Sequence, residues 1–505
     1  MAEKVSLSQL ESHLWESANI LRGPVDASDF KTYIFPLLFF KRISDVFDEE
    51  MREALEESGG DSEYARFPEN HRFQIPDRCH WSDVREKTTD VGFALQRAMR
   101  EIEQENPSTL YGIFGDAQWS NKERLSDTLI RDLIEHFSRL PLGNLNASSD
   151  ILGQAYEYLI KKFADATNKK AGEFYTPRSV IRLMIEILDP RSGETIYDPA
   201  CGTGGMLLGA VQHVKETGNN INLLWGKLYG QEKNLTTSSI ARINLFLHGI
   251  EDFKIARGDT LRQPAFFHGD DLATFDCVIA NPPFSLKKWG RELWVNDPFG
   301  RSFAGLPTDN NGDFAWLQHM ISSMDPQAGR MAVVLPHGAL FRSGAEGKMR
   351  RKILEMDILD AVIGLGPNLF YGAGLAAAIL IFRSKKTAER KNRILVIDAS
   401  QQYQKGRAQN IFEEFHRTQV YRWYSDFENV EGAARVVSLS EIASNNWNLN
   451  IPRYVEPVIE EESITVEEAL VNLKAAMSDA FLAEDRLKQL LIQNDLMPDE
   501  RIDGR

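Results

Sequence analysis

The chain has 505 residues, a hydrophobic fraction of 43% and a net charge of −15, which indicates two or three domains with ordinary cores. The negative charge disfavours a protein that grips a nucleic-acid backbone alone, because Lys and Arg supply much of that affinity. Neither a signal peptide nor a membrane-spanning run is evident, and the three cysteines lie far apart without metal-ligand or pairing patterns, so we expect folding in a reducing cytoplasm.

Residues 1–160 lack glycine-punctuated strands and predict an N-terminal helical domain. Apolar residues recur at helical spacing over residues 7–21 and share one face, and Gly23 follows as a stop signal. The next apolar run, residues 30–45, is too short and too charged at its end to span a bilayer. We expect it to form a buried helix that is kinked near Pro36.

Between about residue 165 and residue 400, apolar strands alternate with helical stretches. This alternation predicts an α/β fold with a doubly wound sheet in a second domain, residues 161–455. Near the start of that domain, Thr176-Pro177-Arg178 precedes a helical stretch. By itself, a Thr-Pro pair in that place is an ordinary helix N-cap with proline in the first turn.

A short strand, residues 195–197, leads into a glycine-rich turn and a helix that runs to Val214. The turn carries Asp198, Ala200, Gly202, Thr203, Gly204 and Gly205. Glycine lets the backbone approach a ligand closely, and a helix N-terminus favours an anionic group. Strand, glycine-rich turn and helix form the nucleotide-binding corner of a doubly wound sheet, although many such turns are only tight connections.

Three further strands end near polar side chains. Residues 228–232 end in Glu232, residues 253–258 lead to Asp259, and residues 275–280 lead to Asn281. A carboxylate at the end of the second strand can accept both hydroxyls of a ribose. Ligands bind at the carboxyl ends of parallel strands, so we expect these three residues and Asp198 to converge on one crevice.

The fourth strand is followed by Asn281-Pro282-Pro283-Phe284. This turn suits alkylation of a planar amino nitrogen, whose lone pair is delocalised into a ring. The Asn281 side-chain oxygen and the Pro282 carbonyl can accept both N–H hydrogens and so relocalise the lone pair, and the prolines keep the carbonyl aimed. Phe284 offers a ring face to an extruded base. Taken alone, the four residues are equally a proline-terminated strand followed by a core Phe.

The long segment that follows, residues 285–311, interleaves basic with aromatic residues: Lys287, Lys288, Trp289, Arg291, Trp294 and Arg301. It predicts either contact with phosphates and bases near a flipped nucleotide or a solvated, mobile loop. Later strands are expected at residues 331–335, 358–363 and 376–382, the last two as a reversed hairpin at the end of the sheet.

The motifs from Asp198 to Phe284 resemble those of the amino-group DNA methyltransferases that use S-adenosyl-L-methionine, in the class whose cofactor motifs precede the catalytic motif. The resemblance implies a Rossmann-like methyltransferase sheet in a catalytic domain, residues 161–455, and methyl transfer to adenine N6 without a metal. It implies that the catalytic residues are Asn281, Pro282, Pro283 and Phe284. It implies cofactor contacts by Glu173, Phe174, Tyr175, Thr176, Pro177, Arg178, Asp198, Ala200, Gly202, Thr203, Gly204, Gly205, Glu232, Asp259 and Asn281.

In that family, the acid of the glycine-rich loop and the acid after the second strand hold the methionine and ribose ends of the cofactor. The acid after the third strand contacts the cofactor's adenine, and the Thr-Pro turn closes over the methionine part. One departure is Cys201, where a small residue that varies among relatives is expected. It changes none of these expectations.

Both ends of the chain narrow the resemblance. Residues 7–45 and residues 447–454 look like the modification subunit of type I restriction–modification systems, and the likeness extends from Leu7 to about Tyr454. The partners it implies are double-stranded DNA, a specificity subunit that reads the target, a second copy of the chain and a restriction subunit, with no membrane. The charge of −15 agrees with recognition in trans.

The tail, residues 456–505, predicts a helix with a capping box formed by Thr465 and Glu468. Its apolar residues fall on four- and three-residue steps: Val466, Leu470, Leu473, Met477, Ala480, Leu487 and Leu491. Such a seam fits a coiled coil or bundle with a partner helix, and the alternative is a helix packed on its own domain. The resemblance implies contact with the specificity subunit through this helix and the N-terminal domain.

Three alternatives stay open at this point. A solitary methyltransferase of another defence system would have the same site and read its target alone or through a different partner. Cytosine N4, RNA or a protein glutamine could be the substrate, because each offers a planar nitrogen. An inactive scaffold of the same shape is the third, and the intact acids and the unbroken turn from Asn281 to Phe284 argue against it.

Overall fold

The computed structural model describes residues 4–166, 176–370, 374, 376–407, 409–456, 466–494 and 496. The chain forms two compact units, Met1–Glu456 and Pro457–Arg505. A boundary near residue 160, between an N-terminal helical domain and a catalytic domain, stays a prediction.

The N-terminal part of the first unit is helical. Its helices are α1 (Leu7–Leu21), α2 (Phe30–Glu57), α3 (Trp81–Arg85), α4 (Val91–Glu105), α5 (Asp127–Phe137) and α6 (Ser149–Ala166). Helix α1 begins with a capping box between Ser6 and Gln9 and buries the predicted apolar face. Helix α2 continues through Pro36, and nearly all of its first half is buried, as predicted.

A nine-stranded sheet forms the centre of the unit, in the order β11-β10-β8-β9-β7-β6-β1-β2-β3. The strands are β1 (Ile196–Asp198), β2 (Leu228–Glu232), β3 (Lys254–Arg257), β6 (Cys277–Ala280), β7 (Arg330–Pro336), β8 (Leu359–Leu365), β9 (Ala377–Arg383), β10 (Arg393–Ala399) and β11 (Ala434–Ser438). Strand β9 runs antiparallel between β7 and β8, which confirms the reversed hairpin. Strands β10 and β11 were not predicted.

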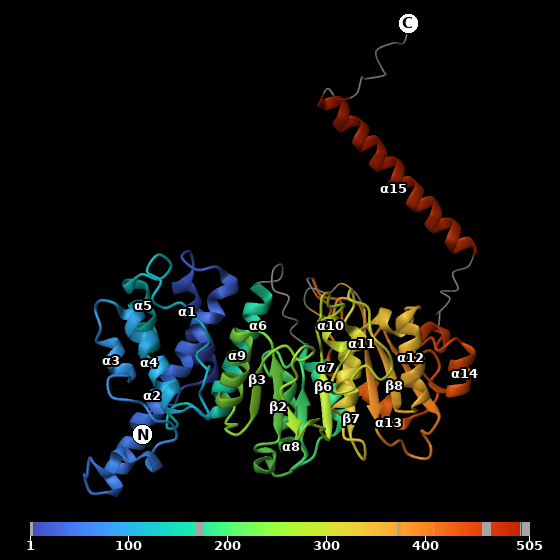
Figure 1. Ribbon diagram of the computed structural model, residues 1–505. Coiled ribbons are helices and arrows are strands. Elements are labelled where there is room, and N and C mark those ends of the chain that lie inside the picture. The colour runs from blue at the N-terminus through green and yellow to red at the C-terminus, as the bar shows by residue number, and fades with distance from the viewer. Residues whose placement is uncertain are drawn as a thin grey trace. The chain divides into compact units, whose positions relative to one another are not determined.

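Helices cover both faces of the sheet, which confirms the predicted α/β fold (Figure 1). One core lies under α7 (Arg178–Leu188), α8 (Gly205–Glu216), α9 (Leu235–Leu247) and α13 (Glu414–Asp426). The other lies under α11 (Asp313–Ser322), α12 (Ala345–Glu355) and α14 (Leu439–Ser444). The small elements are α10 (Arg291–Trp294), a hairpin of β4 (Phe267–His268) and β5 (Asp271–Leu272), and the 3-10 helices η1 (Ala27–Asp29), η2 (Tyr64–Arg66), η3 (Pro68–Asn70), η4 (Ile221–Leu224), η5 (His337–Leu340) and η6 (Ile451–Arg453).

Helix α9 connects the helical part to the sheet. Its residues Ile240, Ile243 and Phe246 belong to the apolar core of the N-terminal helices, whereas Ala241 and Leu245 belong to a core of the sheet. The N-terminal helices therefore lie beyond the β3 edge (Figure 1). That edge is next to the strands that carry the predicted acids.

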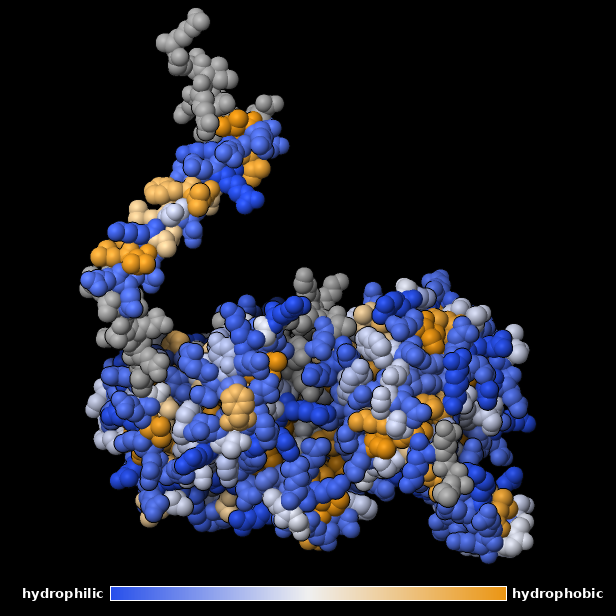
Figure 2. Space-filling model, turned by 180° about the vertical axis from the view of Figure 1, so that it is seen from behind, coloured by the Kyte–Doolittle hydropathy of each residue, from blue (hydrophilic) through white to orange (hydrophobic). Residues whose placement is uncertain are grey.

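The second unit contains α15 (Val466–Gln493). Large apolar side chains are exposed along its length: Leu470, Val471, Leu473, Met477, Phe481, Leu482, Leu487 and Leu490. Figure 2 shows these apolar residues in orange along the helix. Thr465 of the predicted capping box lies outside the described residues. Among the helices that the structure describes, none has the length and hydropathy of a membrane span.

Candidate active site

The polar ends of four neighbouring strands meet at one edge of the sheet. Strands β6, β1, β2 and β3 are adjacent and parallel, so their carboxyl ends point the same way. Asp198 and Glu232 are the last residues of β1 and β2, and Asp259 and Asn281 follow β3 and β6. The structure thus brings the four predicted residues to one edge, where α/β sheets bind ligands.

The glycine-rich turn links the first two acids. The Ala200 N–H donates to Asp198 Oδ1 at 3.0 Å, and the Gly202 N–H donates to Glu232 Oε2 at 3.1 Å. Gly204, the N-cap of α8, has a φ of +81°, and a Cβ added there would lie 3.5 to 3.6 Å from Ala241. The turn is therefore a tight cradle of backbone in front of a helix N-terminus, the geometry that favours close approach of a ligand.

Asp198 is 2% exposed. Burial, with a smaller contribution from the negative charge of Glu232, raises the pKa of Asp198 to about 8, although the Ala200 N–H works in the opposite direction. A buried carboxyl without a cationic partner is better neutral than ionised. A cation bound beside Asp198 would favour the carboxylate again.

The third acid is held by residues that follow β2 and β3. Lys233 Nζ lies 2.9 Å from Asp259 Oδ2. Thr260 Oγ1 donates to the carbonyl of Pro199 at 2.6 Å, and Arg301 Nη1 donates to the carbonyl of Thr260 at 3.1 Å. This chain of hydrogen bonds fixes Asp259 relative to the turn that carries Asp198.

The turn after β6 leaves one polar atom unsatisfied. The Asn281 side-chain nitrogen donates to Thr176 Oγ1 at 2.9 Å, whereas Asn281 Oδ1 is buried and has no hydrogen-bond partner among the described residues. An unpaired buried acceptor is costly and needs an explanation. Phe284 meets Phe370 edge to face, with ring centroids 6.1 Å apart.

The Thr-Pro segment is only partly described. Glu173, Phe174 and Tyr175 lie outside the described residues. Pro177 is the N-cap of α7, and Arg178, its first residue, pairs with Glu157 of α6. Thr176 does not cap α7, since no side chain makes a capping hydrogen bond there and its hydroxyl accepts from Asn281 instead.

The segment after Phe284 differs from both predictions for it. Trp289, Trp294 and Arg301 are buried. These three side chains therefore do not belong to a solvated loop, and they are not available to stack on bases or to bind phosphates. Their polar atoms bond within the fold: Trp289 Nε1 to the Thr308 carbonyl, Trp294 Nε1 to the Leu261 carbonyl, and Arg301 to Asp297. Trp289 and Trp294 belong to a small core of their own with Leu261, Ala315 and Trp316, and only Lys287 and Lys288 of the predicted set are exposed.

Two residues beside the turn were missed from the sequence. Asp313 is buried, accepts from the Ser285 N–H at 2.7 Å and pairs with Arg342. Phe370 lies against Phe284. For Phe370 a signal existed, since it follows a strand and a Gly-Pro-Asn turn in the same sheet. Nothing in the local pattern marks Asp313, which lies in the first turn of α11.

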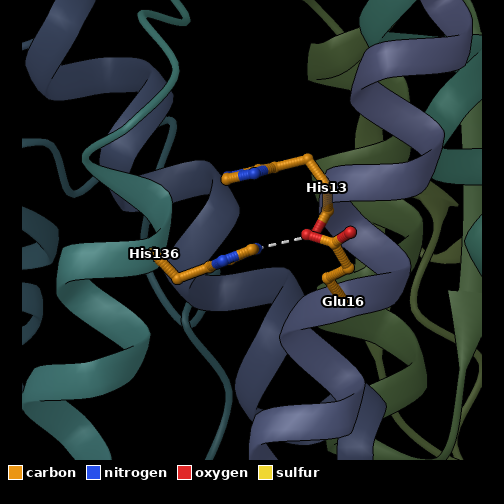
Figure 3. A group of neighbouring side chains, drawn as sticks. All are labelled: His13, Glu16 and His136. Atoms are coloured by element: carbon orange, nitrogen blue, oxygen red, sulfur yellow. Dashed lines mark hydrogen bonds between the residues drawn. The ribbon is translucent and has the colours of Figure 1, made fainter.

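A second polar group lies away from this edge, between α1 and α5 (Figure 3). His13 and His136 stack with ring centroids 3.9 Å apart and an interplanar angle of 10°, and Glu16 is beside them. His136 Nε2 is bonded to the carbonyl of His13 at 2.8 Å. Imidazole lone pairs lie in the ring planes, so two parallel stacked rings cannot both point at one ion, and the group is an interhelical contact.

Comparison with known proteins identifies the family. The N-6 DNA methylase profile matches residues 147–463, and the HsdM N-terminal domain profile matches residues 10–137. The type I restriction enzyme MjaVIII methylase subunit of Methanocaldococcus jannaschii is 32% identical over 93% of this chain and 82% of its own length. The HindI methylase subunit of Haemophilus influenzae is 32% identical over 81% of this chain and 93% of its own.

A solved structure agrees with these relatives. The type I restriction–modification methyltransferase subunit from Streptococcus thermophilus superposes with a TM-score of 0.77 and 31% identity, over 90% of this chain and all of that chain. The chain therefore belongs to the N-6 DNA methylase family, as a DNA methyltransferase of the kind that forms the modification subunit of type I restriction–modification systems.

Proposed function

We propose that the chain transfers a methyl group from S-adenosyl-L-methionine to the N6 amino group of adenine in double-stranded DNA, at targets read by a separate specificity subunit. One observation carries the proposal: Asn281 Oδ1 is buried at the end of β6 and has no hydrogen-bond partner within the described part of the chain. A buried acceptor without a donor is satisfied when a substrate N–H reaches it. The adenine amino group supplies two such hydrogens.

The turn from Asn281 to Phe284 performs the chemistry. Asn281 Oδ1 accepts one amino hydrogen and the Pro282 carbonyl accepts the other, which draws the nitrogen lone pair out of conjugation. The extruded adenine stacks on Phe284, whose ring Phe370 supports edge-on. S-adenosyl-L-methionine, when bound at the β1 to β3 ends, would supply the electrophilic methyl group, with its sulfonium becoming a thioether as the bond to nitrogen forms. The amino group needs no general base beforehand, because its proton can leave to solvent after the methyl has arrived.

The cofactor residues are those at the β1, β2 and β3 ends. Asp198 is buried and would meet the cationic methionine end as a carboxylate after releasing its proton, and the backbone of Gly202 and Gly204 allows close approach. Glu232 receives the ribose hydroxyls and Asp259 the adenine. The donor set supports this assignment, since acids on consecutive strands and a glycine-rich turn are what a nucleoside with a cationic tail requires.

Target recognition comes from partners. The charge of −15 is unsuited to gripping DNA alone, and the exposed apolar residues of α15 suit a helix of a specificity subunit. The assembly we propose has two copies of this chain and one specificity subunit, with a restriction subunit added for cleavage. It works in the cytoplasm, where it protects host DNA and where the buried thiols stay reduced.

The proposal is tested on the complex assembled with its specificity subunit, with tritium-labelled cofactor and a duplex that holds one target. Asn281→Ala should abolish transfer while cofactor affinity stays within about twofold of the parent. Asn222→Ala, an exposed asparagine in η4, is the matched control and should transfer at the parental rate. Transfer at the parental rate by the Asn281→Ala complex would refute the proposed mechanism.

A further inference from the structure

We infer that Thr176 is a positioning residue that holds the Asn281 amide in place at the end of β6 by a hydrogen bond. The inference rests on the proposed function, in which the Asn281 side-chain oxygen accepts an amino hydrogen. The two residues are 105 positions apart, yet the Asn281 side-chain nitrogen donates to Thr176 Oγ1 at 2.9 Å. This is the hydrogen bond that the structure gives to the nitrogen end of the amide.

An asparagine amide has two ends of nearly equal shape and opposite hydrogen-bonding character. If the amide turned by half a rotation, its N–H groups would face the amino hydrogens of adenine, and donor would oppose donor. The hydrogen bond to Thr176 limits that rotation by holding the amide in place, although a hydroxyl can pair with either end of an amide. In the structure the nitrogen end is bonded to Thr176 and Asn281 Oδ1 has no partner among the described residues. Without the hydroxyl, the nitrogen end would lose the hydrogen bond that the structure gives it and the amide could rotate more freely.

The hydroxyl is itself held in place by its surroundings. Pro177 follows Thr176 and restricts the backbone of Thr176 to extended conformations. Pro177 is also the N-cap of α7, whose apolar side is buried against the sheet. The first residue of α7, Arg178, pairs with Glu157 of α6. Thr176 is therefore attached to two anchored helices and can act as a fixed point for a side chain on β6.

A positioning role for Thr176 can be distinguished from a contact between Thr176 and the cofactor, because the two affect different measurements. A positioning role acts on the rate of the methyl-transfer step once both ligands are bound. A cofactor contact acts on cofactor affinity. The side-chain oxygen alone carries the positioning role, so serine should replace threonine and valine, of the same shape, should not.

The test uses the complex with its specificity subunit and compares Thr176→Val with Thr176→Ser. Cofactor affinity is measured by calorimetry, and the methyl-transfer rate constant is measured in a single turnover at saturating cofactor and target duplex. Thr176→Val should lower the rate constant by about tenfold or more and change cofactor affinity by less than about twofold. Thr176→Ser should restore the rate constant to within about threefold of the parent.

Two results would overturn the inference. One is a Thr176→Val complex with an unchanged rate constant, whether or not cofactor affinity falls. The other is a Thr176→Ser complex as slow as Thr176→Val, which would assign the effect to the methyl group. Thr418→Val, an exposed position on α13, controls for complex preparation. Failure of the proposed function is seen separately, as full transfer by Asn281→Ala.

Discussion

Asp313 accepts a hydrogen bond from the backbone N–H of Ser285 at 2.7 Å, and so ties the residue after Phe284 to the first turn of α11. Ser285 has a φ of +51°, in the left-handed region that non-glycine residues seldom adopt. The other carboxylate oxygen of Asp313 pairs with Arg342, which follows β7. The turn that presents Phe284 is thus fixed from two neighbouring elements.

We predict that Asp313→Ala loosens this turn and lowers the methyl-transfer rate by about tenfold or more, because a small misplacement of a stacking face is costly. Cofactor affinity should stay within about twofold, since Asp313 does not contact the β1 to β3 edge. Single-turnover transfer and calorimetry measure the two quantities. A variant with normal transfer would show that the turn holds its shape without Asp313.

The pKa of Asp198, raised to about 8 by burial, predicts pH-dependent cofactor binding. In the cofactor-free protein the carboxyl keeps its proton at neutral pH, whereas the cationic end of the cofactor favours the carboxylate. Binding should therefore release about one proton below pH 8, and affinity should rise about tenfold for each pH unit up to that value. Above pH 8 it should level off.

The same raised pKa makes the stability of the cofactor-free chain fall with pH, whereas cofactor affinity rises with pH. The unfolded chain loses the Asp198 proton near pH 4 and the cofactor-free folded chain near pH 8. Over that window the folded state binds more protons, so the contribution of Asp198 to stability falls as pH rises. For the binding prediction, calorimetry of cofactor binding in two buffers of different ionisation enthalpy counts the proton that binding releases. Asp198→Asn should remove it, and proton release that persists in this variant would assign it to another group.

The ion pair of Asp297 and Arg301 predicts a large stability effect. Its N–O distance is 2.7 Å, and the two side chains are 1% and 2% exposed. Arg301→Gln leaves a buried carboxylate without its partner, which costs about 3–5 kcal/mol. Urea unfolding of the isolated chain measures the change.

The exposed pair of Arg422 and Asp426 is the matched control, with side chains that are 74% and 51% exposed. Arg422→Gln should change the free energy of unfolding by less than about 1 kcal/mol. Equal losses in the two variants would show that burial does not determine the contribution of these pairs.

The exposed apolar residues of α15 predict that this helix contacts the specificity subunit. Replacing its exposed Leu473 and Met477 by Ser should abolish co-elution with the specificity subunit in size-exclusion chromatography. Cofactor binding by the isolated chain should not change, because α15 belongs to the second compact unit. Replacing Asp479 and Lys488 on the same helix by Ser is the control. Intact co-elution of the Leu473 and Met477 variant would place the specificity subunit elsewhere.

Much of the sheet could be predicted from the sequence. Buried parallel strands are short apolar runs, and those ending in Asp198, Glu232 and Asn281 had both the run and a polar residue at its end. Strand β10 has the same apolar character but no motif at its end, and β11 pairs only at the sheet edge, so neither was singled out.

The segment after Phe284 shows what local pattern cannot give. Basic and aromatic residues in alternation fit a nucleic-acid contact and a buried cluster equally well, because Arg301 can stack on Trp294 as readily as on a base. Which of the two forms depends on backbone carbonyls that are distant in the sequence. The fold brings the carbonyls of Leu261 and Thr260 beside Trp294 and Arg301. The bond between Thr176 and Asn281 is likewise a tertiary contact, invisible to spacing.

The most direct test of the central claim is single-molecule sequencing of genomic DNA from the host, with the parental gene and with Asn281→Ala. We predict that N6-methyladenine disappears from a split, two-part motif in the variant strain and persists in an Asn222→Ala strain. Loss from a short contiguous motif would instead indicate a methyltransferase that works without a type I specificity subunit. An unchanged pattern of adenine methylation in the Asn281→Ala strain would contradict the claim.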